Sequence, residues 1–464
     1  MVDVTRLYDR YAWGNRTPYA IRDYLKEAWD TWSIRPCYAL LVGDAGSTGR
    51  ATKKEGMFIP TQFFQTYKWG SSITDAWYGD VDEDLYQEII IGRLPVRETE
   101  QLANALAKLR VWHEKPVVDS WLNRIVMIAG YEDEFKQQTE TIISRQIPDG
   151  VQIDRLYINP GAETGPFYGT TATLSDFINA GRPLVNFRGH GGGAVWADRS
   201  LFTLDDVEGL ENIEKPCIIT SFTCFTAAFE TERGLGEGLT RLPGGSVGFL
   251  GSSGLGWVVN DYLMLQAIYR YLFEEGVSFG RAVQRGKLQY VSTTGWATHT
   301  KTGFYQYNIL GDPSILLPFE DAKNTLKITP PDAAPGESIT LEIPGFSAPS
   351  ATLDLTFRGS RDTKHPIMQN RPLKPASGSQ LTITLPDTIH AEKGDVTVFY
   401  WNETEGTYRA GHAPLSFGAS VIYNPVFVAG PPEIGGKAAV QVKVLDSQGV
   451  DSVLIRWQEG SEEL

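Results

Sequence analysis

The sequence predicts an α/β region over residues 1–318 and an all-β region after it. Two observations support this fold class. Up to residue 318, short apolar runs alternate with segments whose apolar residues recur at helical spacing, which is typical of α/β proteins. From residue 324 onward, short alternating runs are separated by Pro and Gly turns with almost no helical pattern, which indicates a β-sandwich of immunoglobulin type without its usual cysteine pair.

The length of 464 residues exceeds what one hydrophobic core usually supports, so we expect several domains. The expected divisions are an N-terminal α/β subdomain at 1–117, a second α/β subdomain at 118–318, an immunoglobulin-like β-sandwich at 319–417, and a partial or truncated β domain at 418–464. The chain opens without a signal-peptide pattern and inside what reads as a domain, so we expect a piece of a longer protein.

The elements follow from the spacing of apolar residues and from the Pro and Gly residues between them. In the first subdomain we expect helices at 18–32 and 98–113, strands at 38–42 and 88–91, and loops over 45–87. In the second we expect strands at 125–129, 152–156, 184–187, 217–222 and 246–250, and helices at 135–145, 172–180, 234–242, 262–275 and 279–290. The β region is expected to contain strands at 326–329, 339–343, 353–357, 381–385, 396–400, 439–445 and 452–457.

Composition and charge exclude several classes of protein. The chain is 42% hydrophobic and 21% charged, which is ordinary for a soluble globular protein. Its net charge of −14 argues against non-specific binding to nucleic acid or to anionic membranes, because both need clustered Lys and Arg. No run of 18 apolar residues is present, so we expect no transmembrane segment. Two of the three cysteines, Cys217 and Cys224, lie at opposite ends of one expected strand, too far apart for a disulfide.

The residues that suggest chemistry follow two of the expected buried strands. His190 comes just after the strand at 184–187, and Cys224 just after the strand at 217–222. In open α/β sheets, ligands bind at the carboxyl ends of the strands. A cysteine attacks as its thiolate, and a neighbouring imidazole promotes that ionisation, so these two residues form a candidate nucleophile and base if their strands are neighbours.

Glycines after His190 suggest a second element of acyl transfer. Gly191 is followed by two more glycines, whose backbone N–H groups can turn inward where a side chain would block them. The N–H groups of Gly191 and Cys224 are therefore candidates for an oxyanion hole, in which one donor contributes about 3–4 kcal/mol. The alternative is that Cys224 is a small core residue and that the glycines form a turn.

These segments resemble the gingipain family of cysteine endopeptidases, within the caspase-like peptidases. The resemblance rests on the His-Gly motif at His190 and the downstream Cys224, and it runs from about residue 36 to 318. Supporting segments are Leu40-Leu41-Val42-Gly43-Asp44, Ile91-Gly92-Arg93-Leu94-Pro95-Val96, Gly244-Gly245-Ser246-Val247-Gly248 and Leu310-Gly311-Asp312-Pro313-Ser314. The resemblance implies a catalytic caspase-like region at 118–318, a Cys224–His190 dyad, protein or peptide substrates, no cofactor for catalysis, and a location outside a bacterium or on its surface.

The resemblance also assigns roles around the dyad. Glu132 matches the acid that orients the catalytic histidine; the alternative is that this acidic run, with Asp133 and Glu134, caps the following helix. Asp198 is an alternative acid or part of the substrate pocket. In the family, the loop that corresponds to residues 251–257 lines that pocket, which makes Ser253 and Trp257 candidates, with Trp257 stacking on the substrate. Nearby acids suggest a basic residue before the scissile bond: Asp198, Glu230, Glu232 and Asp261.

Acidic residues also crowd residues 75–84, where Asp80, Asp82 and Asp84 stand at alternate positions. Such oxygen ligands suit Ca²⁺, although the glycine and final Glu of an EF-hand loop are missing, so a solvated acidic loop is the alternative. Calcium in relatives makes a structural ion compatible with the resemblance.

Three functions remain open at this stage. The first is a cysteine endopeptidase. The second is a sortase-like transpeptidase that processes secreted cargo, in which an amine rather than water resolves the acyl-enzyme. The third is a catalytically silent surface scaffold, which requires His190 and Cys224 to lie far apart. The oligomeric state is left open.

Overall fold

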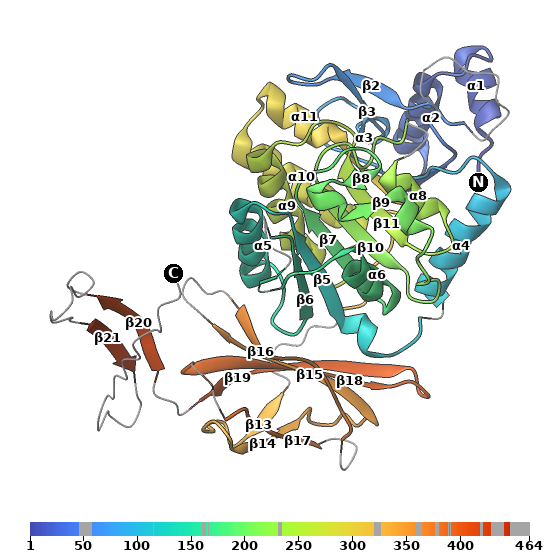
Figure 1. The fold of residues 1–464 in the computed structure, drawn as a ribbon. Helices are drawn as coiled ribbons and strands as arrows, with labels where there is room; N and C mark the ends of the chain where they lie inside the picture. Colours follow the sequence, from blue (N-terminus) through green and yellow to red (C-terminus); the bar gives the residue numbers. More distant parts are fainter. Residues whose placement is uncertain are drawn as a thin grey trace. The chain divides into compact units, whose positions relative to one another are not determined.

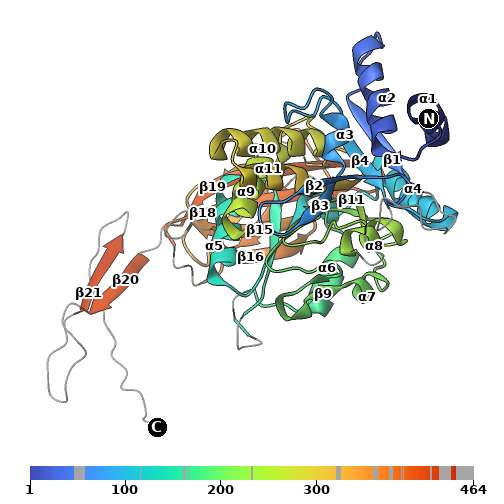
Figure 2. The ribbon, with the colours of Figure 1, turned by 90° about the horizontal axis from the view of Figure 1, so that it is seen from above.

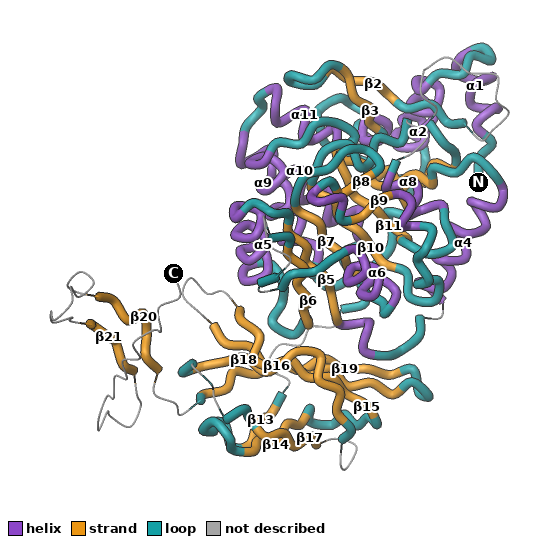
Figure 3. The backbone as a smooth tube through the Cα atoms, viewed as in Figure 1, coloured by secondary structure: helices purple, strands orange, loops and turns teal. Residues whose placement is uncertain are grey.

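The computed structural model describes residues 1–45, 58–114, 116–159, 164–165, 167–230, 234–319, 326–358, 364–375, 380–387, 389, 391–417, 421–427 and 440–445. The chain divides into two compact units, one of Met1–Asp321 with Trp401–Tyr408 and one of Ala322–Tyr400 with Arg409–Leu464. Helices and strands alternate in the first unit, whereas the described residues of the second are built from strands (Figures 1 and 3). Among the described residues, no helix combines the length and apolar character needed to cross a membrane.

One eight-stranded sheet forms the centre of the first unit. Its strands in spatial order are β1 (Tyr38–Val42), β4 (Ile90–Leu94), β12 (Tyr307–Gly311), β11 (Ser246–Ser252), β10 (Cys217–Phe222), β7 (Leu184–Arg188), β5 (Arg124–Ala129) and β6 (Gln152–Tyr157). The five strands from β11 to β6 are parallel, whereas β12 is antiparallel to β11 and parallel to β4. The strands expected in the two α/β subdomains therefore share a single sheet.

Helices cover both faces of this sheet, and every strand except the partly exposed edge strand β1 is buried throughout. Figure 2 shows α9 to α11 on one side of the sheet and α6 to α8 on the other. The bounds of the helices in this unit are α1 (Val4–Ala12), α2 (Pro18–Thr31), α3 (Ala76–Gly79), α4 (Thr99–Glu114), α5 (Asp133–Arg145), α6 (Thr171–Asn179), α7 (Leu204–Val207), α8 (Leu235–Arg241), α9 (Val258–Leu272), α10 (Phe279–Thr294) and α11 (Thr298–Gln306).

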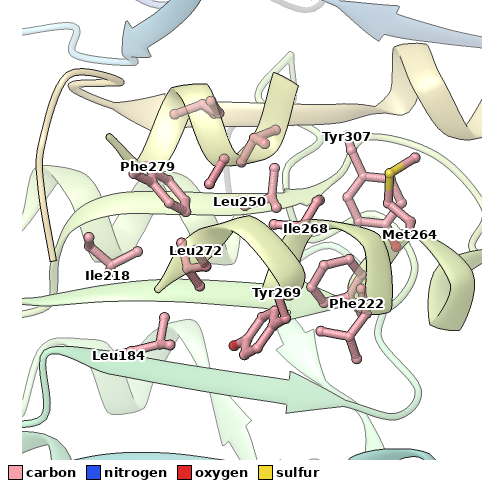
Figure 4. Packing of buried hydrophobic residues seen from close by; sticks show 14 of the residues in the cluster. Leu184, Ile218, Phe222, Leu250, Met264, Ile268, Tyr269, Leu272, Phe279 and Tyr307 are labelled. Carbon is pink, nitrogen blue, oxygen red and sulfur yellow. The ribbon is translucent and has the colours of Figure 1, made fainter. Parts of the chain in front are cut away.

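Alternate residues of each central strand enter the two cores, as the period-2 geometry of strands requires. In β10, Ile218 belongs to the core under α9 and α10, while Ile219 belongs to the core under α6 and α8. Figure 4 shows the first of these cores, in which side chains from three adjacent strands meet α9. The residues concerned are Leu184, Ile218 and Leu250 of the sheet and Met264, Ile268 and Leu272 of α9.

The segment 45–87 departs from the sequence-based expectation of loops. Its described part contains a hairpin of β2 (Gln62–Gln65) and β3 (Ser71–Thr74), followed by α3. Each strand has only four residues, too few to show a clear alternation of apolar and polar residues. Arg93 of β4 fixes this segment to the central sheet through Asp75. The guanidinium is fully buried and bonds both carboxylate oxygens of Asp75 at 2.6 and 2.9 Å.

The second unit contains two facing antiparallel sheets, which confirms the predicted β-sandwich. One sheet has the order β13 (Lys327–Thr329), β14 (Ser338–Glu342), β17 (Gln380–Thr384), and the other β16 (Lys364–Leu373), β15 (Ser350–Arg358), β18 (Lys393–Asn402), β19 (Thr407–Ser416). The sequence analysis missed β16 and β19. Further on, β20 (Val421–Phe427) pairs with β21 (Val440–Leu445), and the strand expected at 452–457 lies outside the described residues.

Replacing Arg93 by Met should lower the free energy of unfolding by about 3–5 kcal/mol, because Asp75 would remain buried and unpaired. Urea denaturation measures the change. The exposed pair Arg285–Glu274, at 2.7 Å, provides the control: Arg285→Met should cost less than about 1 kcal/mol. Equal losses in the two variants would contradict the anchoring role of Arg93.

Candidate active site

The candidate site lies at the carboxyl ends of four neighbouring parallel strands, β5, β7, β10 and β11. Arg188, the last residue of β7, is the register partner of Phe222, the last residue of β10. His190 and Cys224 each follow two residues later, so both leave the same edge of the sheet from adjacent strands. This is the adjacency that the sequence analysis required of a nucleophile and a base.

The two loops are in contact just past the strand ends. A methyl group built on Gly191 would lie 2.5 Å from Thr223 Cγ2 and 3.0 Å from the carbonyl oxygen of Cys224. Only a residue without a side chain fits this close approach. The absence of a side chain at Gly191 therefore lets the loop after His190 pack against Thr223 and the backbone of Cys224.

Glu132 forms a direct bond with the histidine. Its Oε1 lies 2.6 Å from His190 Nε2, and both side chains are partly exposed. Glu132 is the N-cap residue of α5, yet its side chain caps no helix N–H, so it is available to the imidazole. Because Nε2 faces Glu132, Nδ1 is the nitrogen that remains for exchange of a proton with a thiol.

Aromatic rings and Asp198 fix the histidine from the other sides. The Phe135 ring meets the imidazole edge-on at 5.2 Å, and the Tyr131 ring lies at 5.9 Å. The backbone N–H of His190 donates to Asp198 Oδ2 at 2.7 Å. Asp198 is only 1% exposed, and burial raises the pKa of its carboxyl group. It acts as an internal clamp on the histidine loop.

The Cys224 thiol lies against the loop that follows β11. The backbone N–H of Gly256 donates to Cys224 Sγ at 3.2 Å. Burial raises the pKa of the thiol, while the Gly256 N–H and the guanidinium of Arg188 act in the opposite direction. The next residue, Phe225, has a φ of +61°, an uncommon conformation for a residue with a side chain. The chain therefore turns just after Cys224, which lies two residues beyond the end of β10.

The other proposed pocket residues differ in what they offer a substrate. Trp257 is half-buried, and its ring lies 6.1 Å from that of Tyr67, roughly edge to face. Ser253 is buried, and its hydroxyl bonds the carbonyls of Ile73 and Gln306 at 2.7 and 3.1 Å. Its hydroxyl is therefore engaged inside the protein. Among the acids near the site, Glu232 lies outside the described residues.

The acidic segment brings together a different set from the three aspartates at alternate positions. Asp80, Asp82 and Glu88 each offer a carboxylate oxygen within 4.8 Å of the others. Asp80 is fully buried, and its Oδ1 has no hydrogen-bond partner. Asp84 instead accepts a bond from the backbone N–H of Tyr86 at 2.7 Å, within its own turn.

Comparison with known proteins identifies the family. The sequence model described as peptidase family C25 matches residues 1–318. The chain belongs to peptidase family C25. Lys-gingipain W83 of Porphyromonas gingivalis is 25% identical over 345 residues, which cover 67% of this chain and 18% of that protein. Gingipain R2 of Porphyromonas gingivalis is 26% identical over 225 residues, which cover 46% and 27%. This C25 chain thus spans under a third of the length of these relatives.

The fold of this C25 chain is also that of a solved relative. The crystal structure of the Arg specific cysteine proteinase gingipain R superposes with a TM-score of 0.56 at 20% identity, covering 88% of this chain and 94% of that one. Two predictions are thereby confirmed: the caspase-like α/β region, which the resemblance implied, and the immunoglobulin-like domain, which the alternating strand pattern indicated.

One residue of the site received no role from sequence reasoning. Arg188 ends β7 directly before Gly189-His190, and its side chain is 1% exposed at the base of the site. The available signal was a charged residue at the end of an otherwise apolar strand.

Adding a methyl group at Gly189 should destabilise the C25 domain, because the methyl would lie 2.3 Å from Asp198 Oδ2 and 2.7 Å from the Phe187 ring. Gly189→Ala should cost about 1–3 kcal/mol, as overpacking usually does. Gly192→Ala is the matched control, since its nearest neighbour, Val195 Cγ1, lies at 3.8 Å. Thermal unfolding of both variants measures the difference, and an unchanged Gly189→Ala would argue against the clamp.

Proposed function

We propose that the chain is a cysteine endopeptidase in which Cys224 is the nucleophile, His190 the acid and base, and Glu132 the group that orients the imidazole. The observation that carries this proposal is the meeting of the His190 and Cys224 loops beside the 2.6 Å bond from Glu132 to His190. A catalytically silent scaffold has no need of this arrangement at one strand edge.

The residues support a two-step acyl transfer. His190 takes the thiol proton of Cys224, and the sulfur attacks the peptide carbonyl carbon. His190 then gives the proton to the leaving amine, and the acyl group remains on sulfur as a thioester. Water, deprotonated by His190, attacks the thioester and releases the carboxylic acid and the thiol. The carboxylate of Glu132 stabilises the imidazolium that forms in each step.

The N–H groups of Gly191 and Cys224 are the proposed donors to the developing oxyanion. Their backbones are adjacent because Gly191 has no side chain to separate it from Thr223 and Cys224. The N–H of the next residue, Gly192, already donates to the carbonyl of Val195 at 3.0 Å. Of the glycine run, Gly191 is thus the better candidate.

We further propose a protein or peptide substrate with a basic residue before the scissile bond, read beside Trp257. The names Lys-gingipain and Arg specific gingipain R support a basic side chain, as does the acidity of the chain. Asp261 is 3% exposed and lies 4.0 Å from the guanidinium of Arg188, so its charge is already opposed inside the protein. The family also supports a location outside the cell or on the surface of a bacterium.

Cys224→Ala should reduce cleavage of a mixed peptide library by more than about 1000-fold, because no other group replaces the thiolate. Cys37→Ala, at an exposed cysteine, is the control and should cleave like the wild type. The wild type should cleave after Lys or Arg. Undiminished cleavage by Cys224→Ala would overturn the peptidase assignment, whereas cleavage after acidic or apolar residues would overturn only the basic preference.

Addition of an amine nucleophile separates hydrolysis from transpeptidation, because only a transpeptidase yields the amide product in quantity.

We also propose that Asp80, Asp82 and Glu88 hold a structural Ca²⁺. The support is their convergence within 4.8 Å and the unpartnered, buried Oδ1 of Asp80. Nearby, Glu83 and Leu85 have φ angles of +67° and +69°, so the loop adopts a strained conformation around the carboxylates. No step of the proposed catalysis involves this ion.

Calcium should raise the melting temperature of the wild type relative to an excess of chelator, because an ion bound only to the folded state stabilises it. Asp80→Asn should abolish that difference. Asp84→Asn, which removes a carboxylate outside the cluster, should retain it. A melting temperature that does not respond to calcium would exclude the site.

A further inference from the structure

Arg188 connects the segments that carry the active-site residues. It is 1% exposed, ends β7 and stands two residues before His190. Its Nη1 donates to the carbonyl of Phe222 at 3.0 Å, and its Nη2 donates to the carbonyl of Val258 at 2.6 Å. Phe222 precedes the Cys224 turn, and Val258 follows the loop whose Gly256 N–H meets the thiol. One guanidinium therefore bonds both the end of the strand before Cys224 and the chain after the Gly256 loop.

The same side chain reaches the helix that carries Glu132. Arg188 Nε donates to Gln138 Oε1 at 2.9 Å, and Gln138 lies in α5, whose N-cap residue is Glu132. The guanidinium also lies 4.7 Å from the centre of the Phe135 ring, the ring that meets His190 edge-on. Arg188 thus contacts the residues that support Glu132, His190 and Cys224, through Nε, the face of the guanidinium and Nη1 respectively.

A buried carboxylate opposes this charge. Asp261, in the first turn of α9, lies 4.0 Å from Arg188 Nη1 and is 3% exposed. A methyl group on Gly256 would lie 2.3 Å from Asp261 Oδ2, so the carboxylate lies directly behind the residue that donates to Cys224 Sγ. The charged and titratable groups that act on the thiol are therefore Arg188, Asp261 and the buried Tyr307. His190, bonded to Glu132, lies on the loop after the neighbouring strand β7.

The opposed charges act on the thiol in opposite directions. Burial raises the pKa of Cys224, the Gly256 N–H lowers it, Asp261 raises it, and Arg188 lowers it. Since a buried charge is weakly screened, removing either partner should change the ionisation of the thiol. Loss of packing alone has no reason to produce changes of opposite sign.

We infer that the buried Arg188–Asp261 pair is a positioning element of the proposed dyad: Arg188 holds the loops of Cys224, Gly256 and Glu132 in register, and the pair places two opposite charges next to the loop whose Gly256 N–H bonds the thiol. This inference rests on the proposed function. It concerns Arg188 and Asp261 as positioning residues that act through Cys224 and His190.

The test measures the thiol itself. Wild type, Arg188→Gln and Asp261→Asn are alkylated with iodoacetamide between pH 5 and 9, and mass spectrometry follows the peptide that contains Cys224. Below the thiol pKa, Arg188→Gln should slow alkylation by about tenfold, and Asp261→Asn should accelerate it by about threefold to tenfold, as loss of a nearby charge predicts. Circular dichroism reports whether each variant is folded.

Arg188→Lys separates charge from geometry. It keeps the charge but not the three-way fork of bonds, so its alkylation profile should stay within about twofold of the wild type while kcat for peptide cleavage falls by about tenfold or more. Arg124→Gln and Asp154→Asn are matched controls, because this buried pair, at 2.9 Å, lies away from the strand ends that carry the site. Their alkylation profiles should equal that of the wild type.

Shifts of the same sign in Arg188→Gln and Asp261→Asn, or no shift in either, would overturn the inference. If Arg188→Gln does not fold, the other two variants test the inference. Faster alkylation in Asp261→Asn and a wild-type alkylation profile in Arg188→Lys support it, and the absence of both overturns it. The alkylation measurements that decide the inference need no peptide turnover. They therefore fail or succeed independently of Cys224→Ala, which tests the peptidase assignment.

Discussion

The parallel pairing of β7 with β10 is the constraint on which the site depends. The pairing places Arg188 beside Phe222. The two strands therefore end at the same level of the same sheet edge, and the loops that carry His190 and Cys224 begin side by side. Because side chains alternate with a period of two, a slip of one strand by one residue would move its core side chains to the opposite face of the sheet. The two cores on either face of the sheet resist such a slip, since Ile218 and Ile219 belong to different cores. The position of the proposed dyad is thus a consequence of the packing of the sheet.

Close backbone approach is the second requirement of the site. Gly189, Gly191 and Gly256 each stand where a methyl group would lie within 2.5 Å of a neighbouring atom. The neighbours differ: Asp198 for the first, Thr223 for the second and Asp261 for the third. The glycines of the His-Gly motif therefore serve the approach of loops to one another, and Gly191 also serves the proposed oxyanion site. A turn alone would not need all three.

Buried charge is concentrated beneath the site. Arg188, Asp198 and Asp261 are each at most 3% exposed, and placing such groups in the interior costs free energy. Burial raises the pKa of both aspartates, so the protein must hold them with hydrogen bonds or an opposite charge. The His190 N–H bonds Asp198, and the guanidinium of Arg188 opposes the charge of Asp261. These contacts fix the relative positions of the loops, which the proposed catalysis by Cys224 and His190 requires.

The sequence by itself determined the fold class and the identities of the candidate dyad. The apolar runs at 184–187 and 217–222 and the residues after them are local features, and the observed strands begin and end within one residue of the expected ones. The tertiary structure alone decided what depends on contacts between distant residues. It inserted β12 between β4 and β11, antiparallel to β11 and parallel to β4. It also formed the β2–β3 hairpin in a segment without a strong pattern, and it grouped Glu88 rather than Asp84 with Asp80 and Asp82. It also placed Arg188 among four segments of the candidate site. Such outcomes are set by which strands and loops become neighbours, and spacing along one chain carries no information about that.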